Sequence, residues 1–248
     1  MNKELFVYFS TPDSDCRNLM AYRGVEKMIE TGIIKEENWE CKTNNKDSLP
    51  KNYNAILHDP RTTGKILCLV HSDLIIDDLF VGDKLNARFE RSRDACMVGI
   101  AGGGGIARTP LDLELWHLMT PKGGHLGEVT NNATEDILSP VWTTRFGTHG
   151  KRAMIIDGCF MALDTDRIRK IGATFDEKCP SGFHFYDLIF SLRCIWAGGD
   201  IYVDPIHVVH RSIGLTKTTE DFLLGNQYFK DNYLSRLWTS NEKEKLDH

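Results

Sequence analysis

The sequence predicts an α/β protein in which helices cover both faces of a central, mixed but mostly parallel sheet. Three observations support this prediction. Residues 5–10 form a short run rich in Phe, Tyr and Val, and residues 16–33 follow it with apolar side chains at helical spacing. Residues 66–70 are continuously apolar, as in a buried parallel strand. Strands and helices mix along the whole chain, which favours a three-layer arrangement.

The other elements of the first half are shorter. Residues 39–42 are compatible with a second strand, and the strand at 66–70 ends in the polar cluster His71-Ser72-Asp73. Another apolar run, 96–101, precedes four consecutive glycines, 102–105. Glycine permits a loop to move or a backbone to approach a ligand closely, so we expect a flexible loop after this strand.

The second half alternates less regularly. Residues 106–151 have poor periodicity and many Gly, Pro, Asn and Thr residues, which predicts a long functional loop region with short helices. After it we expect a strand at 153–163, a helix at 166–171 capped by Asp164 or Thr165, and a buried helix at 186–197 closed by two glycines. Two short strands at 201–203 and 207–209, a helical pattern at 219–237 and a solvated tail at 241–248 complete the chain.

Composition limits the possible functions. The chain has 248 residues, 30 Lys and Arg against 35 Asp and Glu, and a net charge of -5, so no global basic field attracts nucleic acid. Apolar stretches stop well short of the roughly 18 residues that span a bilayer. No secretory signal is evident, and seven scattered cysteines suit reduced thiols. We expect one cytoplasmic domain without an integral membrane segment.

Asp73 is the sharpest candidate for chemistry. A buried strand delivers it to the carboxyl end of the sheet, where open α/β sheets bind ligands. A carboxylate there can hold Mg2+ or Mn2+, which in turn neutralises a diphosphate, and His71 is close enough to assist. The alternative is that Asp73 only caps the next helix, and the residues alone give the two interpretations about even weight.

Two further segments carry candidate side chains. His184 and Asp187 share one face of a firmly packed helix if that helix begins early, which suits an acid or base; alternatively, Asp187 pairs with Arg193 or caps the helix. His207 and His210 lie near the end of a strand. We favour His210 as a metal ligand because it lies beyond the last apolar residue of that strand.

The order of these motifs resembles the GT-A glycosyltransferases, and specifically the family 2-like enzymes similar to the StrF protein of streptomycin biosynthesis. The matching segments are HSD at 71–73 as a version of the D-x-D motif, IIDGCFMAL at 155–163, FDE at 175–177, GFHFYD at 182–187 and HRSIG at 210–214. They occur in order between about residues 53 and 214. The resemblance implies a GT-A fold, a single domain over 1–240, a nucleotide-sugar half at 1–105 and an acceptor and catalytic half at 106–240.

The resemblance also implies roles for individual residues. Asp187 corresponds to the general base of inverting members, and Asp73 and His210 correspond to metal ligands. Residues expected to contact the nucleotide sugar are Ser10, Thr11, Pro12, Glu40, His71, Asp73, Asp157, Gly158 and His184.

The sequence-based hypothesis is therefore a glycosyltransferase assisted by Mn2+ or Mg2+. It would move a sugar from a nucleotide diphosphate, such as a UDP-sugar, to a hydroxyl of a glycan, a lipid-linked sugar or a small molecule. Two alternatives remain: a noncatalytic nucleotide-sugar- or glycan-binding protein of the same fold, and a glycosyltransferase acting on a modified DNA base. A first D-x-D position occupied by His71 leaves the strength of metal dependence open. A pyrophosphorylase is disfavoured because residues 9–18 contain no glycine.

Overall fold

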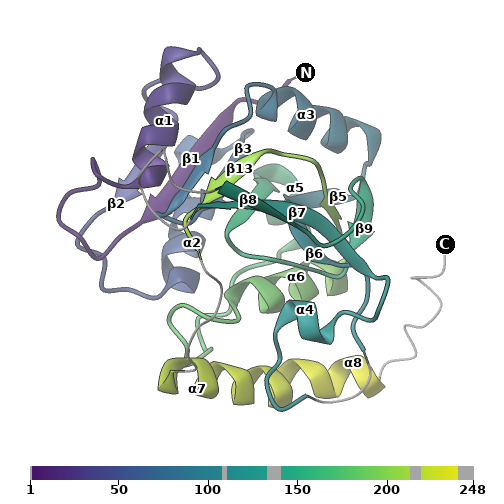
Figure 1. The fold of residues 1–248 in the computed structure, drawn as a ribbon. Helices are drawn as coiled ribbons and strands as arrows, with labels where there is room; N and C mark the ends of the chain where they lie inside the picture. The colour runs from purple at the N-terminus through teal and green to yellow at the C-terminus, as the bar shows by residue number, and fades with distance from the viewer. Residues whose placement is uncertain (1, 108–110, 133–140, 213–218, 240–248) are drawn as a thin grey trace.

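A seven-stranded sheet forms the centre of the protein, for which the computed structural model describes residues 2–107, 111–132, 141–212 and 219–239 (Figure 1). β1 is parallel to β2 and β3, and β5 is parallel to β12, whereas β11 is antiparallel to β3 and β5, and β9 to β12. The predicted mixed, mostly parallel sheet is therefore confirmed. The strand order is β2 (Trp39–Lys42), β1 (Leu5–Ser10), β3 (Ile66–Val70), β11 (Phe160–Asp164), β5 (Ala95–Gly99), β12 (Asp200–Val203) and β9 (Lys151–Ala153).

A second, smaller sheet lies on the face turned toward the viewer in Figure 1. It brings β4, which follows β3 almost directly, beside β13, which comes much later in the chain. These two strands are antiparallel, and His210 stands opposite Leu74. The order is β10 (Ile155–Ile156), β6 (Ala101–Gly103), β7 (His125–Asn132), β13 (Val208–His210) and β4 (Leu74–Ile76), with β8 (Val141–Arg145) paired to β7.

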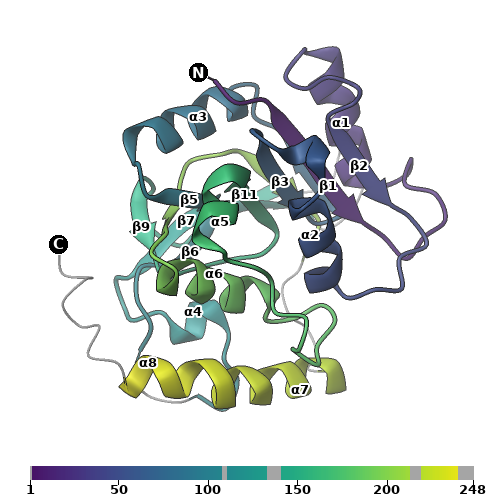
Figure 2. The ribbon, with the colours of Figure 1, turned by 180° about the vertical axis from the view of Figure 1, so that it is seen from behind.

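Helices pack against both faces of the central sheet. The side chains of β1 alternate between the two apolar cores that lie between the sheet and these helices. Val7 and Phe9 belong to the core that also contains residues of α1 (Met20–Glu30) and α3 (Val81–Arg91). Phe6 and Tyr8 belong to the other core, with α2 (Leu49–Leu57) and α5 (Thr165–Ile171), which face the viewer in Figure 2. α6 (Tyr186–Trp196) contributes side chains to both cores.

The C-terminal helices run along the lower edge of both ribbon views. α7 (Glu220–Phe229) continues through a π-helical turn, Lys230–Leu234, into α8 (Ser235–Thr239). The hydroxyls of Tyr228 and Tyr233 both donate hydrogen bonds to Asp176, which ties these helices to the loop before α6. The predicted C-terminal helix is confirmed, and the tail at 241–248 lies outside the described residues.

Several local predictions are confirmed. β1, β2 and β3 have the predicted bounds, and the helix expected within 16–33 spans the shorter range of α1. The side chain of Asp164 accepts a hydrogen bond from the backbone N–H of Arg167 and caps α5 as expected. The helix predicted at 186–197 ends one residue earlier, at Trp196, and Gly198 follows with a positive φ of 91°.

The region from 102 to 163 requires correction. Gly102 and Gly103 belong to β6, which pairs with β10 and β7, rather than to a flexible loop. A Cβ at Gly102 would lie 2.2 Å from the carbonyl oxygen of Ile155 on the neighbouring strand, which explains the glycine there. The region expected to be loop with short helices does contain the short helix α4 (Trp116–Met119), but it also supplies the strands β7 and β8, which were not predicted. The single strand expected at 153–163 is divided among the end of β9, β10 and β11. A short 3₁₀ turn at Pro60–Thr62 completes the elements between α2 and β3.

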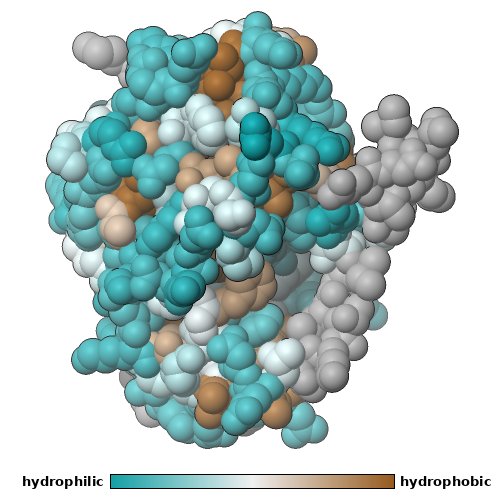
Figure 3. All heavy atoms as spheres, turned by 90° about the vertical axis from the view of Figure 1, so that its left-hand side faces the viewer, coloured by the Kyte–Doolittle hydropathy of each residue, from teal (hydrophilic) through white to brown (hydrophobic). Residues whose placement is uncertain are grey.

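The surface in Figure 3 is mainly hydrophilic, with apolar residues scattered in small separate spots. Such isolated apolar residues are normal on a protein surface. Among the residues that the structure describes, none of the helices combines the length and the apolarity that a membrane span needs.

Candidate active site

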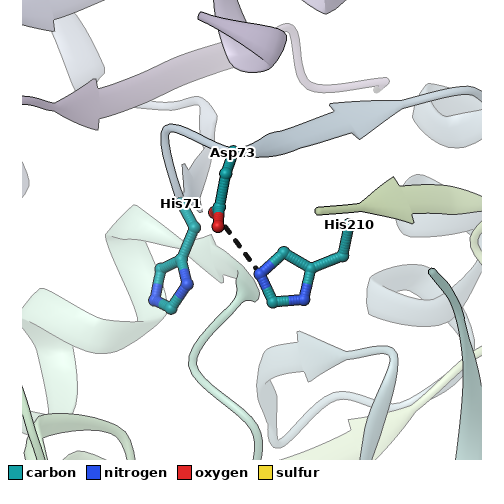
Figure 4. A group of neighbouring side chains, drawn as sticks. All are labelled: His71, Asp73 and His210. Atoms are coloured by element: carbon teal, nitrogen blue, oxygen red, sulfur yellow. Dashed lines mark ion pairs between the residues drawn. The ribbon is translucent and has the colours of Figure 1, made fainter. Parts of the chain in front are cut away.

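Three potential metal ligands meet where β3 and β13 end. His71 and Asp73 lie in the turn between β3 and β4, and the pairing of β13 with β4 carries His210 to the same place. One ligand atom from each side chain lies within 4.8 Å of the others, and Nε2 of His210 is 3.4 Å from Oδ1 of Asp73 (Figure 4). The strand pairing therefore assembles a cluster from residues about 140 positions apart.

The pKa shifts of His71 and Asp73 suit a divalent cation. Burial lowers the pKa of His71 to about 4, and the neighbouring His210 adds to this effect. Burial opposes ionisation of Asp73, but its hydrogen bond with His210 and the charge of that imidazole outweigh burial and lower the pKa of Asp73. Neutral imidazole and ionised carboxylate are the forms that bind metals, so the donor set fits Mn2+ or a similar ion.

Two carboxylates meet beside the cluster, one in the turn between β10 and β11 and one at the start of α6. Asp157 accepts hydrogen bonds from the indole Nε1 of Trp116 at 2.8 Å and from the backbone N–H of Cys159 at 2.9 Å. Asp187, in the first turn of α6, accepts hydrogen bonds from the backbone N–H groups of Gly158 and Leu188, both at 2.9 Å. These bonds fix both carboxylates in position.

The two carboxyl groups have opposite pKa shifts. Burial raises the pKa of Asp187 to about 7, and the charge of Asp157 adds to this effect. Burial opposes ionisation of Asp157 as well, but the hydrogen bonds from Cys159, together with the neighbouring imidazoles of His210 and His71, outweigh burial and lower its pKa. A carboxylate with a pKa near 7 is well matched to general-base work at neutral pH.

Gly158 has a packing reason for being glycine. A Cβ at this position would lie 2.3 Å from the hydroxyl oxygen of Tyr186 and 2.9 Å from Cβ of Asp187. Both distances are far below contact, so a side chain at 158 would displace Tyr186 or Asp187.

These residues line one cavity of about 350 Å³, which is the size of small-ligand sites. The cavity joins seven residues that the sequence predicted for the site, and it draws them from both predicted halves of the chain. The seven are His71, Asp73, Asp157, Gly158, His184, Asp187 and His210.

Four other residues predicted from the N-terminal half, Ser10, Thr11, Pro12 and Glu40, do not line this cavity. The hydroxyl of Thr11 is bonded to Asp13, and Ser10 ends β1 beside Lys42, with Pro12 exposed in the following loop. Glu40 forms an ion pair with Arg61. Their contact with a nucleoside therefore stays a prediction.

The sequence motifs missed several cavity residues. Glu114 is buried, its pKa is raised by burial, and it accepts a hydrogen bond from the backbone N–H of Leu111. Trp116 holds Asp157, Phe183 faces the ring of His71 with centroids 5.4 Å apart, and Tyr186 contacts His71. Glu114 and Trp116 lie in the region without periodicity, where no sequence pattern distinguishes them from their neighbours. Phe183 and Tyr186 lie inside the GFHFYD motif, so that motif could have indicated them as site residues.

Comparison with known proteins identifies the class. The sequence profile described as "Glycosyltransferase like family" matches residues 35–221, which include every side chain of the cluster as well as Asp157 and Asp187. The chain belongs to this glycosyltransferase-like family, and its α/β architecture with a mixed sheet is the GT-A fold predicted from the motifs. None of the curated proteins matches the chain significantly.

Solved structures give distant matches. One is a crystal structure of GalNAc-T7 with UDP, GalNAc and Mn2+, at 11% identity and a TM-score of 0.47, covering 92% of this chain and 48% of that chain. Another is 4-diphosphocytidyl-2C-methyl-D-erythritol synthase from Anaerococcus prevotii DSM 20548, at 13% identity and a TM-score of 0.40, covering 93% of this chain and all of that chain. The chain therefore spans about half the length of GalNAc-T7.

Proposed function

We propose that the protein is a metal-assisted, inverting glycosyltransferase that moves a sugar from a nucleotide diphosphate to an acceptor hydroxyl. The observation that carries this proposal is the shared cavity: a cluster of three metal-binding side chains and Asp187, a carboxylate with a raised pKa, face the same space. Neither a metal cluster nor a tuned carboxylate alone would indicate group transfer.

Asp187 acts as the general base in this proposal. The acceptor oxygen forms a bond to the anomeric carbon while the bond from that carbon to the diphosphate oxygen breaks, and the bonding electrons leave with the diphosphate. Asp187 takes the proton of the acceptor hydroxyl, so the carboxylate must be ionised when the acceptor binds. Attack opposite the leaving group inverts the configuration of the anomeric carbon.

His71, Asp73 and His210 would hold the ion. A bound Mn2+ or Mg2+ would supply positive charge that stabilises the departing diphosphate. Asp157, kept in place by Trp116 and Cys159, lies beside Asp187 and is suited to accept hydrogen bonds from sugar hydroxyls. Gly158 leaves room for Tyr186 and Asp187 beside the sugar.

The donor and compartment follow from the family resemblance and the thiols. We assign a UDP-sugar as the donor, with Ser10, Thr11, Pro12 and Glu40 toward the nucleoside, His184 toward the sugar and the 1–105 half as the donor half. The acceptor is a hydroxyl of a glycan, a lipid-linked sugar or a small molecule. All seven cysteines are free thiols, which supports a reducing compartment such as the cytoplasm.

A donor-binding experiment with a matched variant tests the proposal. Thermal unfolding is measured with UDP-, GDP- and dTDP-sugars, each with Mn2+ and with a chelator, because a ligand that binds the folded state raises the unfolding temperature. We expect a metal-dependent rise with one or two donors, and release of the nucleoside diphosphate once an acceptor is supplied. Asp187→Asn should keep the rise and lose transfer. Metal-dependent binding without turnover on any acceptor would favour a noncatalytic binding protein, and no shift with any donor would contradict the proposal.

A further inference from the structure

A chain of hydrogen bonds joins the cluster residue His71 to Asp187. Nε2 of His71 is 2.7 Å from the hydroxyl oxygen of Tyr186, and the same hydroxyl is 2.9 Å from the carbonyl oxygen of Gly158. The backbone N–H of Gly158 then donates to Oδ2 of Asp187. One tyrosine thus contacts both a metal-cluster imidazole and the carbonyl of Gly158, the residue whose backbone N–H holds the carboxylate.

The direction of these bonds follows from counting protons. A tyrosine hydroxyl has one proton, and a carbonyl oxygen can only accept, so the proton of Tyr186 must point to Gly158. The hydroxyl oxygen of Tyr186 is then the acceptor for His71, whose Nε2 must carry the ring proton. The reverse arrangement would bring two acceptor oxygens to 2.9 Å with no proton between them.

The consequence lies on the other side of the imidazole. With the proton on Nε2, Nδ1 of a neutral His71 keeps its lone pair. Figure 4 shows one ring nitrogen of His71 facing Asp73 and His210 while the other faces away. The nitrogen left without a proton is therefore the one available to the cluster.

We propose that Tyr186 is a positioning residue that fixes His71 in the Nε2–H tautomer and thereby presents Nδ1 to a divalent cation. The same hydroxyl donates to the carbonyl of Gly158, the residue whose N–H donates to Asp187, so the metal site and the base share one supporting residue. This inference rests on the proposed function, because it concerns the ion which that function requires. Hydrogen-bond partners of this kind typically change metal affinity by about 10- to 100-fold.

The substitution Tyr186→Phe tests the inference, since it removes one oxygen and keeps the ring. Mn2+ binding to the full-length protein is measured by isothermal titration calorimetry, without donor or acceptor. We expect the dissociation constant for Mn2+ to rise about 10- to 100-fold. Tyr233→Phe is the matched control, because it removes another buried hydroxyl, one that donates to Asp176 instead, and should leave Mn2+ binding unchanged.

A second measurement determines the tautomer of His71 directly in the unmodified protein. ¹⁵N NMR of the metal-free, unmodified protein reports which imidazole nitrogen carries the proton, with the His71 signals assigned by their loss in His71→Ala. We expect Nε2–H for His71, and a mixture of tautomers in Tyr186→Phe.

The outcomes separate this inference from the proposed function. If the unmodified protein binds Mn2+ and Tyr186→Phe binds it equally well, or if His71 carries its proton on Nδ1, the role of Tyr186 is overturned while the glycosyltransferase proposal stands. If the unmodified protein binds neither Mn2+ nor Mg2+, the proposed metal dependence fails and this inference fails with it.

Discussion

Asp157 and Asp187 face one cavity from either side of Gly158, yet the protein shifts their pKa values in opposite directions. Asp157 receives hydrogen bonds that favour its charge, and that charge makes ionisation of Asp187 more difficult. Two adjacent carboxylates with separated pKa values are typical of active sites in which one group binds and the other transfers a proton.

The first prediction concerns the pH dependence of transfer. Because Asp187 must be ionised to accept a proton and its pKa is raised to about 7, kcat/KM should increase with pH up to about 7 and then level off. Well below this pH, the rate should fall about tenfold for each unit. The measurement is initial-rate kinetics with saturating metal between pH 5 and 9.

A change at Asp157 checks the cause of this profile. Asp157→Asn removes the neighbouring charge, so the midpoint of the profile should move to lower pH even if the maximal rate falls. A midpoint below pH 5 in the unmodified protein would exclude Asp187 as the group observed.

The second prediction concerns stability. The pKa of Asp187 is higher in the folded protein than the ordinary value of about 3.9 in the unfolded chain, so ionising it costs stability as pH rises from about 4 through 7. Asp187→Asn removes that cost and loses some hydrogen bonding at every pH. The difference in unfolding temperature, variant minus unmodified protein, should therefore increase between pH 5 and pH 8.

Calorimetry or circular dichroism at a series of pH values gives this difference directly. Glu177→Gln serves as a control, because Glu177 is an exposed acid outside the cavity. A constant difference across the range would show that Asp187 has the same pKa in the folded and unfolded states.

The fold and most of the site could be predicted because their signals are local. Asp73 follows a fully apolar strand, and the cap of α5 and the glycines after α6 lie next to the elements they end. Other features depend on residues far apart in sequence. Gly102 must be glycine because the backbone of Ile155 lies against it, and Trp116 belongs to the site because its indole donates a hydrogen bond to Asp157. Neither residue has a nearby sequence pattern that indicates its role. β4 was not predicted, because it has only three residues and forms its strand pairing with β13, which is distant in sequence.

The third prediction concerns the choice of metal. Two of the three donors are imidazole nitrogens, which Mg2+ accepts poorly, whereas Mn2+ tolerates both nitrogen and carboxylate oxygen. We expect Mn2+ to bind more tightly than Mg2+ and to support faster transfer. Calorimetric titration of both ions tests this, and His210→Ala should weaken Mn2+ binding.

His207→Ala is the matched control for that variant. His207 lies three residues away, beside Asp77, and does not line the cavity, so its loss should leave Mn2+ affinity unchanged. Equal affinity for Mn2+ in His210→Ala and the unmodified protein would remove His210 from the metal site.

The fourth prediction concerns Gly158. Gly158→Ala places a methyl group 2.3 Å from the hydroxyl of Tyr186, so the ring must move or the turn must shift. Overpacking of this kind costs about 1–3 kcal/mol, which lowers the unfolding temperature of a protein of this size by roughly 2–12 °C. Transfer should fall as well, because Asp187 depends on the backbone N–H of Gly158 for its position.

Gly105→Ala is the appropriate comparison. A Cβ at Gly105 would meet only Pro121, at an ordinary distance of 3.7 Å, and the position does not line the cavity. Its unfolding temperature and activity should remain close to those of the unmodified protein. If Gly158→Ala is as stable and as active as the unmodified protein, the close approach of Tyr186 and Asp187 to this turn is not what restricts the position to glycine. The two side chains then have room to move away from residue 158 without loss of catalysis.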